Sequence, residues 1–197
     1  MLPAFRYISS MLARTSEPWR SSRLAALSIA GFIAVLLAAG VVSTDALEHS
    51  RQAAVGRAVE MATPALAGWI TAQRDALAPA AAPPPPAMVA LLSGYFSTSM
   101  LSSVRYRVGW PESVAGVGLW LADARAITVD HIIVFRDVRL AADPVLWAHE
   151  LTHVRQFERW GARAFARQYL ENRDAVETEA WTAAADYKMW AIAAGQL

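Results

Sequence analysis

The C-terminal part of the chain contains the segment Trp147-Ala148-His149-Glu150-Leu151-Thr152-His153-Val154-Arg155-Gln156, in which two histidines enclose a glutamate. On an α-helix, His149 and His153 would share one face, separated by about 6 Å of rise. Two imidazoles at this spacing can bind one metal ion, and Glu150, one step around the helix, would lie beside the metal. The pattern is therefore typical of a site in which a glutamate acts as general base on metal-bound water.

The residues around this motif predict a helix long enough to carry it. Asp143 is a suitable N-cap and Pro144 a suitable first-turn residue. The segment 145–160 contains neither glycine nor proline, and Gly161 is a natural stop. The chain has 4 histidines in total. Two of them stand at metal-binding spacing on this capped helix, which favours a metal site over a chance occurrence of the pattern.

Composition limits the classes of protein to which the chain can belong. Its 197 residues are enough for one modest domain with appendages. Residues are 55% hydrophobic and 18% charged, which indicates a membrane segment, and the net charge of +1 gives no electrostatic case for binding nucleic acid. The chain has no cysteine. Disulfides and thiol catalysis are therefore excluded, and any metal must be bound by His, Asp, Glu or water.

The N-terminal region predicts a membrane anchor. Residues 1–23 contain four arginines against one acidic residue, and Leu24 to Val42 contains no charged residue. A helix of this length just crosses a hydrocarbon core of ~30 Å. We predict a basic cytoplasmic segment at 1–23 and a transmembrane helix at 24–43 in a bacterial inner membrane. Because the positive charge precedes the span, the C-terminal domain is expected to be periplasmic or otherwise extracytoplasmic.

A cleavable signal peptide is the second interpretation of this region. Ala38 and Gly40 are placed for cleavage before Val41, which would make the protein secreted. The leader 1–23 and the apolar run after it are both longer than is usual in signal peptides. These lengths favour an uncleaved anchor.

The rest of the chain predicts a stalk, a linker and one α+β domain. We expect a helical stalk at 44–76, a stiff proline-rich linker at 77–88 and the domain at 89–197. The strands predicted for this domain are 104–110, 119–122, 126–128 and 132–135, the last two forming a hairpin around Asp130-His131. The predicted helices are 88–100, 144–160, 162–170 and 174–194.

A hydrolytic zinc site normally has three protein ligands and water, so the motif needs a third ligand. His49 and His131 lie elsewhere in the chain, without a metal-binding interval to the motif. Glu177 and Glu179 follow after one helix and a turn, which allows an antiparallel return to the motif. They lie on different sides of a helix, so only one would reach the metal. Either could instead simply favour the first turn of its helix, where acidic residues are stabilised.

The run Ala148-His149-Glu150-Leu151-Thr152-His153-Val154-x-Gln156 resembles the core metallopeptidase domain associated with extracellular contractile injection systems. The resemblance extends over about residues 102–182. Its other matching elements are Val104-Arg105, Ala126-x-Thr128, Ile133-Val134-Phe135, the lead-in Asp143 to Leu146 and Glu177-x-Glu179-Ala180. The last is similar to a Glu-x-x-Ala element that the family shares with membrane-bound prenyl-protein and heat-shock metallopeptidases. In those proteins its first glutamate is the third zinc ligand, which implies Glu177 here.

The resemblance implies a small zincin-like metallopeptidase domain, with a short antiparallel sheet beside the active-site helices. Zn²⁺ would be bound by His149, His153 and Glu177, with water in the fourth position. Glu150 would take a proton from that water and deliver it to the leaving amine, while a peptide substrate pairs with the edge of the sheet.

Two features of the sequence bear on how complete this site is. His131 and Tyr169 are candidate oxyanion donors, although a structural role is favoured for each. Trp181 stands where related proteins have an aspartate that orients a histidine. Another group is therefore expected to orient the imidazole here.

Two other functions are compatible with the sequence. The chain could be a non-catalytic, membrane-tethered module that binds zinc and an unidentified protein partner, or a scaffold without metal. Glu150 favours catalysis, because a structural zinc site fills its fourth position with protein and has no need of an adjacent base.

Overall fold

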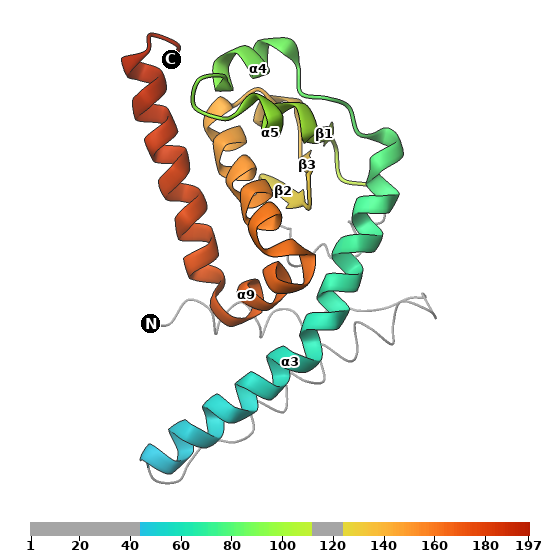
Figure 1. The fold of residues 1–197 in the computed structure, drawn as a ribbon, viewed down its shortest axis with the longest axis vertical. Helices are drawn as coiled ribbons and strands as arrows, with labels where there is room; N and C mark the ends of the chain where they lie inside the picture. The colour runs from blue at the N-terminus through green and yellow to red at the C-terminus, as the bar shows by residue number, and fades with distance from the viewer. Residues whose placement is uncertain (1–43, 112–123) are drawn as a thin grey trace. The chain divides into compact units, whose positions relative to one another are not determined.

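The computed structural model describes residues 44–111 and 124–197 (Figure 1). The predicted span Leu24–Val42 and the predicted strand 119–122 lie outside the described residues. Within the described ranges, no helix is both long and apolar enough to cross a membrane. The chain divides into two compact units, Met1–Ala58 and Val59–Leu197, and the second contains the predicted metal motif.

The described elements are mostly helical with one small sheet, which confirms an α+β class. In chain order they are α3 (Thr44–Leu77), the 3-10 turn η1 (Ala78–Ala80), α4 (Pro86–Leu92), α5 (Thr98–Ser103), β1 (Arg105–Val108), β2 (Ala126–Val129), β3 (Ile132–Phe135), α8 (Val138–Ala141) and α9 (Pro144–Ala193).

The sheet has three strands in the order β1-β3-β2. The predicted hairpin is confirmed: β2 pairs antiparallel with β3, around a turn in which Asp130 has φ 59°. The prediction of a wholly antiparallel sheet is wrong, because β1 pairs parallel with β3. In chain order β2 comes between β1 and β3, so no tight turn joins the two parallel strands, and they can pair in the same direction.

The end of α3 packs against this sheet. The helix predicted at 44–76 is present, and Pro64 lies inside it without ending it. Ile70 and Leu77 are buried in a cluster with residues of β2, β3 and α9. Arg74 places a guanidinium nitrogen 3.2 Å from a carboxylate oxygen of Asp130. From Val59 onward, α3 is therefore part of the same compact unit as the sheet.

The proline-rich segment after α3 is hydrogen-bonded to the first strand of the sheet. Ala82 forms an antiparallel bridge with Tyr106 of β1, through hydrogen bonds of 2.9 and 2.8 Å. Pro85 has extended φ and ψ angles, and α4 begins at the next residue. The outer edge of β1 is consequently occupied at Tyr106.

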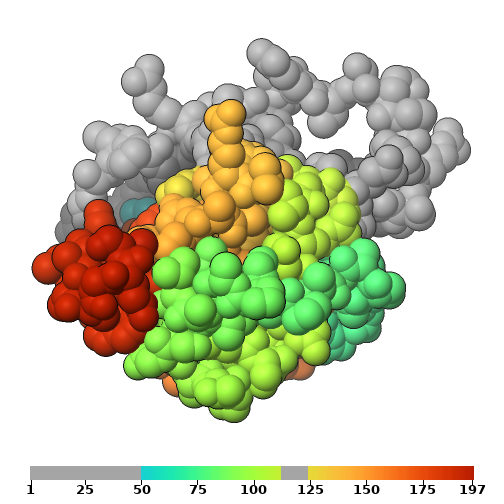
Figure 2. Space-filling view, turned by 90° about the horizontal axis from the view of Figure 1, so that it is seen from above, coloured from blue at the N-terminus to red at the C-terminus, as the bar shows by residue number. Residues whose placement is uncertain are grey.

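The single helix predicted at 88–100 is wrong. α4 ends at Leu92, Gly94 has φ 89°, and α5 begins only after Ser97, whose side chain accepts a hydrogen bond from the Met100 amide. The backbone is already extended at Ser93, the C-cap of α4, and Gly94 then adopts a positive φ that side chains disfavour. Figure 2 shows α4 and α5, in green, beside the C-terminal part of α9, in red.

The three helices predicted between Pro144 and Ala194 form α9, a continuous ribbon whose backbone leaves helical geometry at Gly161 and Asn172. Both breaks stand where they were predicted. Gly161 has φ 71°, which suits a helix C-terminus. The last segment of α9 runs back along the first (Figure 1).

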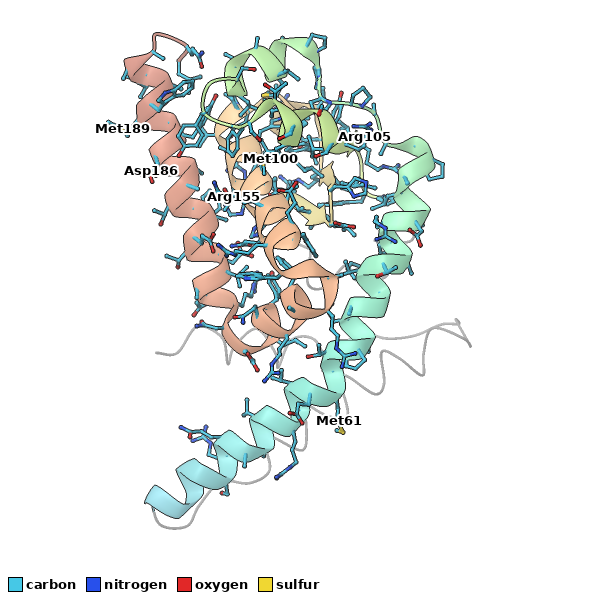
Figure 3. All side chains as sticks on the ribbon, viewed as in Figure 1. Met61, Met100, Arg105, Arg155, Asp186 and Met189 are labelled. Atoms are coloured by element: carbon cyan, nitrogen blue, oxygen red, sulfur yellow. The ribbon has the colours of Figure 1, made fainter. Side chains whose placement is uncertain are left out.

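The core that supports the first segment of α9 is aromatic. Trp147 is fully buried between Phe135 and Tyr106, and its indole N–H donates to the Ala141 carbonyl at 2.8 Å. Met100 lies within this core, whereas Met189, 66% exposed, points outward from the last segment (Figure 3). Burial of Trp147 fixes the rotation of the helix about its axis, and therefore the direction in which the two histidines point.

Candidate metal centre

The helix that carries the motif begins as predicted. One oxygen of Asp143 accepts hydrogen bonds from the amides of Val145 and Leu146, at 2.9 and 3.2 Å. The other oxygen lies 3.0 Å from a guanidinium nitrogen of Arg125, just before β2. The cap therefore both starts the helix and ties it to the sheet.

The three predicted metal ligands converge on one point. Nε2 of His149 lies 3.1 Å from Nε2 of His153, and Oε2 of Glu177 lies 3.5 and 3.7 Å from these two nitrogens. Atoms that bind one zinc ion tetrahedrally at about 2.0–2.1 Å are ~3.3 Å apart. The observed separations bracket this value, so the donor set fits a zinc ion without rearrangement of the backbone. Within the described residues, these three side chains form a group that could hold a metal ion.

The charges around this point also suit a cation. Burial opposes ionisation of Glu177, but hydrogen bonds and charges from His149 and His153 hold its pKa below the usual range. Burial likewise opposes protonation of His153, but Glu177 and the charge of Glu150 raise its pKa. Across the described part of the chain, no arginine or lysine forms an ion pair with Glu150 or Glu177. A divalent cation would balance these two carboxylates.

Glu150 is held by the sheet. It is 3% exposed, and its Oε2 accepts a 2.7 Å hydrogen bond from the hydroxyl of Thr128 on β2. Taking a carboxylate out of water costs several kcal/mol, more than one hydroxyl donor returns. A neighbouring metal ion would offset the difference. The Thr128 contact leaves the second carboxylate oxygen available for a proton.

The two candidate glutamates have different partners. Glu177 faces the imidazoles, whereas Glu179 Oε2 accepts from Arg159 at 2.9 Å and from the Gln156 amide at 3.1 Å. Burial opposes ionisation of Glu179, but these donors lower its pKa. Between the two residues left open by helix geometry, the structure thus brings Glu177, and not Glu179, to the histidines.

The two candidate oxyanion donors lie in different places. The Tyr169 hydroxyl donates to Glu177 Oε1 at 3.2 Å and accepts from Arg173 at 3.0 Å. Burial is the main cause that raises the pKa of Tyr169 to about 12, so the phenol stays protonated. His131 lies in the hairpin turn beside Asp130, and no contact with the ligands is found among the described residues. The side chain of His49 is outside the described residues.

The two histidines have unequal surroundings. His153 Nδ1 lies 2.8 Å from Gln156 Oε1. His149 Nδ1 is buried without a hydrogen-bond partner in the described part of the chain, and the ring of the half-exposed Trp181 lies against His149, with 4.1 Å between centroids and an angle of 46° between the ring planes. An aromatic ring therefore covers His149, and an amide orients His153. No role was predicted for Gln156 from the sequence, although its position three residues after His153 places it one helical turn away.

Comparison with known proteins gives one match. Residues 83–161 match a family model described as the eCIS core domain, so this stretch is similar to a metallopeptidase-like family. The matched stretch includes the sheet, Thr128, Glu150 and both histidines, and it ends before Glu177. No curated protein and no solved structure matches the chain.

Proposed function

We propose that the chain is a membrane-anchored zinc peptidase. The observation that carries this proposal is the placement of three ligand atoms at tetrahedral zinc separations, 3.1–3.7 Å apart, on the helix that also carries Glu150. The similarity of residues 83–161 to a metallopeptidase-like family supports it.

The contacts of the site residues suggest which of them would bind the metal and which would act as the base. A zinc ion at this site would supply Lewis acidity and would lower the pKa of a bound water toward ~7. His149, His153 and Glu177 would bind it. Glu150, aligned by Thr128, accepts a proton and delivers it to the leaving amine.

The outer edge of β2, which pairs with no other strand among the described residues, is the proposed binding surface for a peptide. β2 is an edge strand in the described sheet. Arg136 donates to the Arg125 carbonyl across the hairpin, so alternation directs the backbone groups of Ala126 and Thr128 to the outer edge. An extended peptide paired there would contact the same residue whose hydroxyl holds Glu150. Substrate position and the orientation of the base would thus be set by one residue.

Metal content and hydrolysis of the full-length protein test this function together. We expect one zinc ion per chain and cleavage of an unstructured protein. Cleavage should be lost when a chelator removes the metal and restored when zinc is added back. Zinc-free protein that cleaves as fast as the zinc-loaded protein would contradict the proposal.

A non-catalytic zinc module that binds a protein partner is the alternative. Trp181, Met189 and Ile192 are large apolar side chains that are 49%, 66% and 49% exposed on the last segment of α9. Such side chains favour an interaction surface. In this alternative the protein would bind zinc but hydrolyse no peptide.

The membrane topology is a separate proposal. We infer that Leu24–Val42 spans the membrane, with the C-terminal domain outside the cytoplasm, because four arginines precede the apolar run. A reporter that needs export for its activity, fused after Leu197, should be active, and a reporter that works only in the cytoplasm should be inactive. The reverse result would contradict the topology, and a soluble form that begins near Val41 would indicate signal cleavage.

A further inference from the structure

Gln156 is a fully buried polar residue in contact with both sides of the metal centre. Its amide nitrogen lies 3.1 Å from the Val176 carbonyl and 3.1 Å from Glu179 Oε2. Both of these partners are acceptors only. The NH₂ group must therefore face them, and Oε1 must face His153.

This orientation fixes the proton of His153. Oε1 of Gln156 is an acceptor 2.8 Å from His153 Nδ1, so Nδ1 carries hydrogen and donates. A neutral imidazole with hydrogen on Nδ1 has its lone pair on Nε2. That nitrogen is the one directed at His149 and Glu177. The amide thus selects the tautomer that can bind a metal.

A second contact holds Gln156 itself. Glu179 accepts from Gln156 and from Arg159 through the same oxygen, at 3.1 and 2.9 Å. Charge-assisted bonds of this kind are stronger than neutral ones. Because Gln156 is on the first segment of α9 while Glu179 and Val176 are on the last, the same amide also fastens the segment that carries Glu177 to the histidine helix.

We propose that Gln156 is a positioning residue that holds His153 in the Nδ1–H tautomer, and that Glu179 and Arg159 fix the amide in the required orientation. Gln156 acts on His153, whereas Trp181 lies against the ring of the other histidine, His149. The proposal rests on the proposed function only in taking His153 as a zinc ligand.

Zinc affinity of the full-length protein, measured by competition with a chelating dye, is the first test. Gln156→Leu should weaken zinc binding by ~10–100-fold, the usual effect of losing a partner behind a metal ligand. Glu179→Ala should weaken it by a smaller factor, because Gln156 retains the Val176 carbonyl. Glu171→Ala is the matched control and should change nothing. Its side chain is 37% exposed and paired with Arg167, whereas Glu179 is 35% exposed and paired with Arg159.

A variant of similar size separates positioning from packing. Gln156→Met keeps the length and most of the volume of the side chain but offers no amide oxygen to His153 Nδ1. It should lose zinc affinity as Gln156→Leu does. If Gln156 only fills space, the leucine variant would bind zinc like the wild type, and that result would overturn the proposal.

The tautomer is measured directly from the ring ¹⁵N chemical shifts of His153 in metal-free protein, at a pH where the imidazole is neutral. Hydrogen on Nδ1 is expected in the wild type, with a shift toward Nε2–H in Glu179→Ala or Gln156→Leu. Hydrogen on Nε2 in the wild type would refute the proposal. This readout holds even if Gln156→Leu does not fold, because Glu179 is partly exposed, and even if the wild type proves inactive on peptides.

Discussion

Glu150→Gln is expected to lower peptide hydrolysis by at least ~100-fold while zinc remains bound, the low end of the contribution of a general base. The amide is nearly isosteric with the carboxylate and can still accept the 2.7 Å hydrogen bond from Thr128. It cannot take a proton as a carboxylate does. The loss should therefore fall on turnover, and the zinc content and circular dichroism spectrum should match those of the wild type.

Glu158→Gln provides the matched control. It makes the same change on an exposed position of the same helix and should leave hydrolysis unaffected. Unchanged hydrolysis in zinc-loaded Glu150→Gln protein would refute the role of Glu150 even if the zinc site is correct. Inactivity of both wild type and variant, with partner binding retained, would favour the non-catalytic module.

Loss of stoichiometric zinc is the expected result of His149→Ala or of His153→Ala. Each removes one of three ligands, and two ligands with water bind zinc weakly. Glu177→Ala should also weaken binding strongly, since Glu177 supplies the oxygen at 3.5 and 3.7 Å from the two nitrogens. Metal analysis of protein dialysed against a weak chelator would measure the loss.

Glu179→Ala tests whether Glu179 binds zinc itself or only holds Gln156 by a hydrogen bond. Its oxygen binds Arg159 and Gln156, so we expect a smaller loss of zinc than in Glu177→Ala. Wild-type zinc content in Glu177→Ala, together with loss in Glu179→Ala, would show that the ligand is the other glutamate.

Local signals in the sequence predicted the parts of the fold that depend on neighbouring residues. Asp143 caps its helix, Gly161 and Asn172 interrupt α9, and the hairpin turns at Asp130. Each of these depends on the conformational preference of one or two residues. The positions of this helix start, these two helix breaks and this hairpin turn could therefore be predicted from the sequence alone.

Non-local contacts account for what the sequence did not predict. The parallel pairing of β1 with β3 joins two segments that are not consecutive in the chain, and no residue of β1 encodes it. The role of Gln156 depends on a carbonyl and a carboxylate from the last segment of α9. Thr128 reaches Glu150 only because the hairpin lies on the helix. The side chains of the candidate metal site were predictable from spacing and resemblance, whereas the residues that contact and orient them were not.

All three ligands belong to α9, while the group that aligns Glu150 comes from β2, and this separation implies an order of assembly. Closing the short loop between His153 and Glu177 costs little chain entropy, and local contacts of this kind form quickly. The antiparallel segments of α9 would then bind zinc before the sheet docks. Until Thr128 reaches Glu150, a zinc-loaded chain would have no aligned base, so the proposed hydrolysis would begin only when folding is complete.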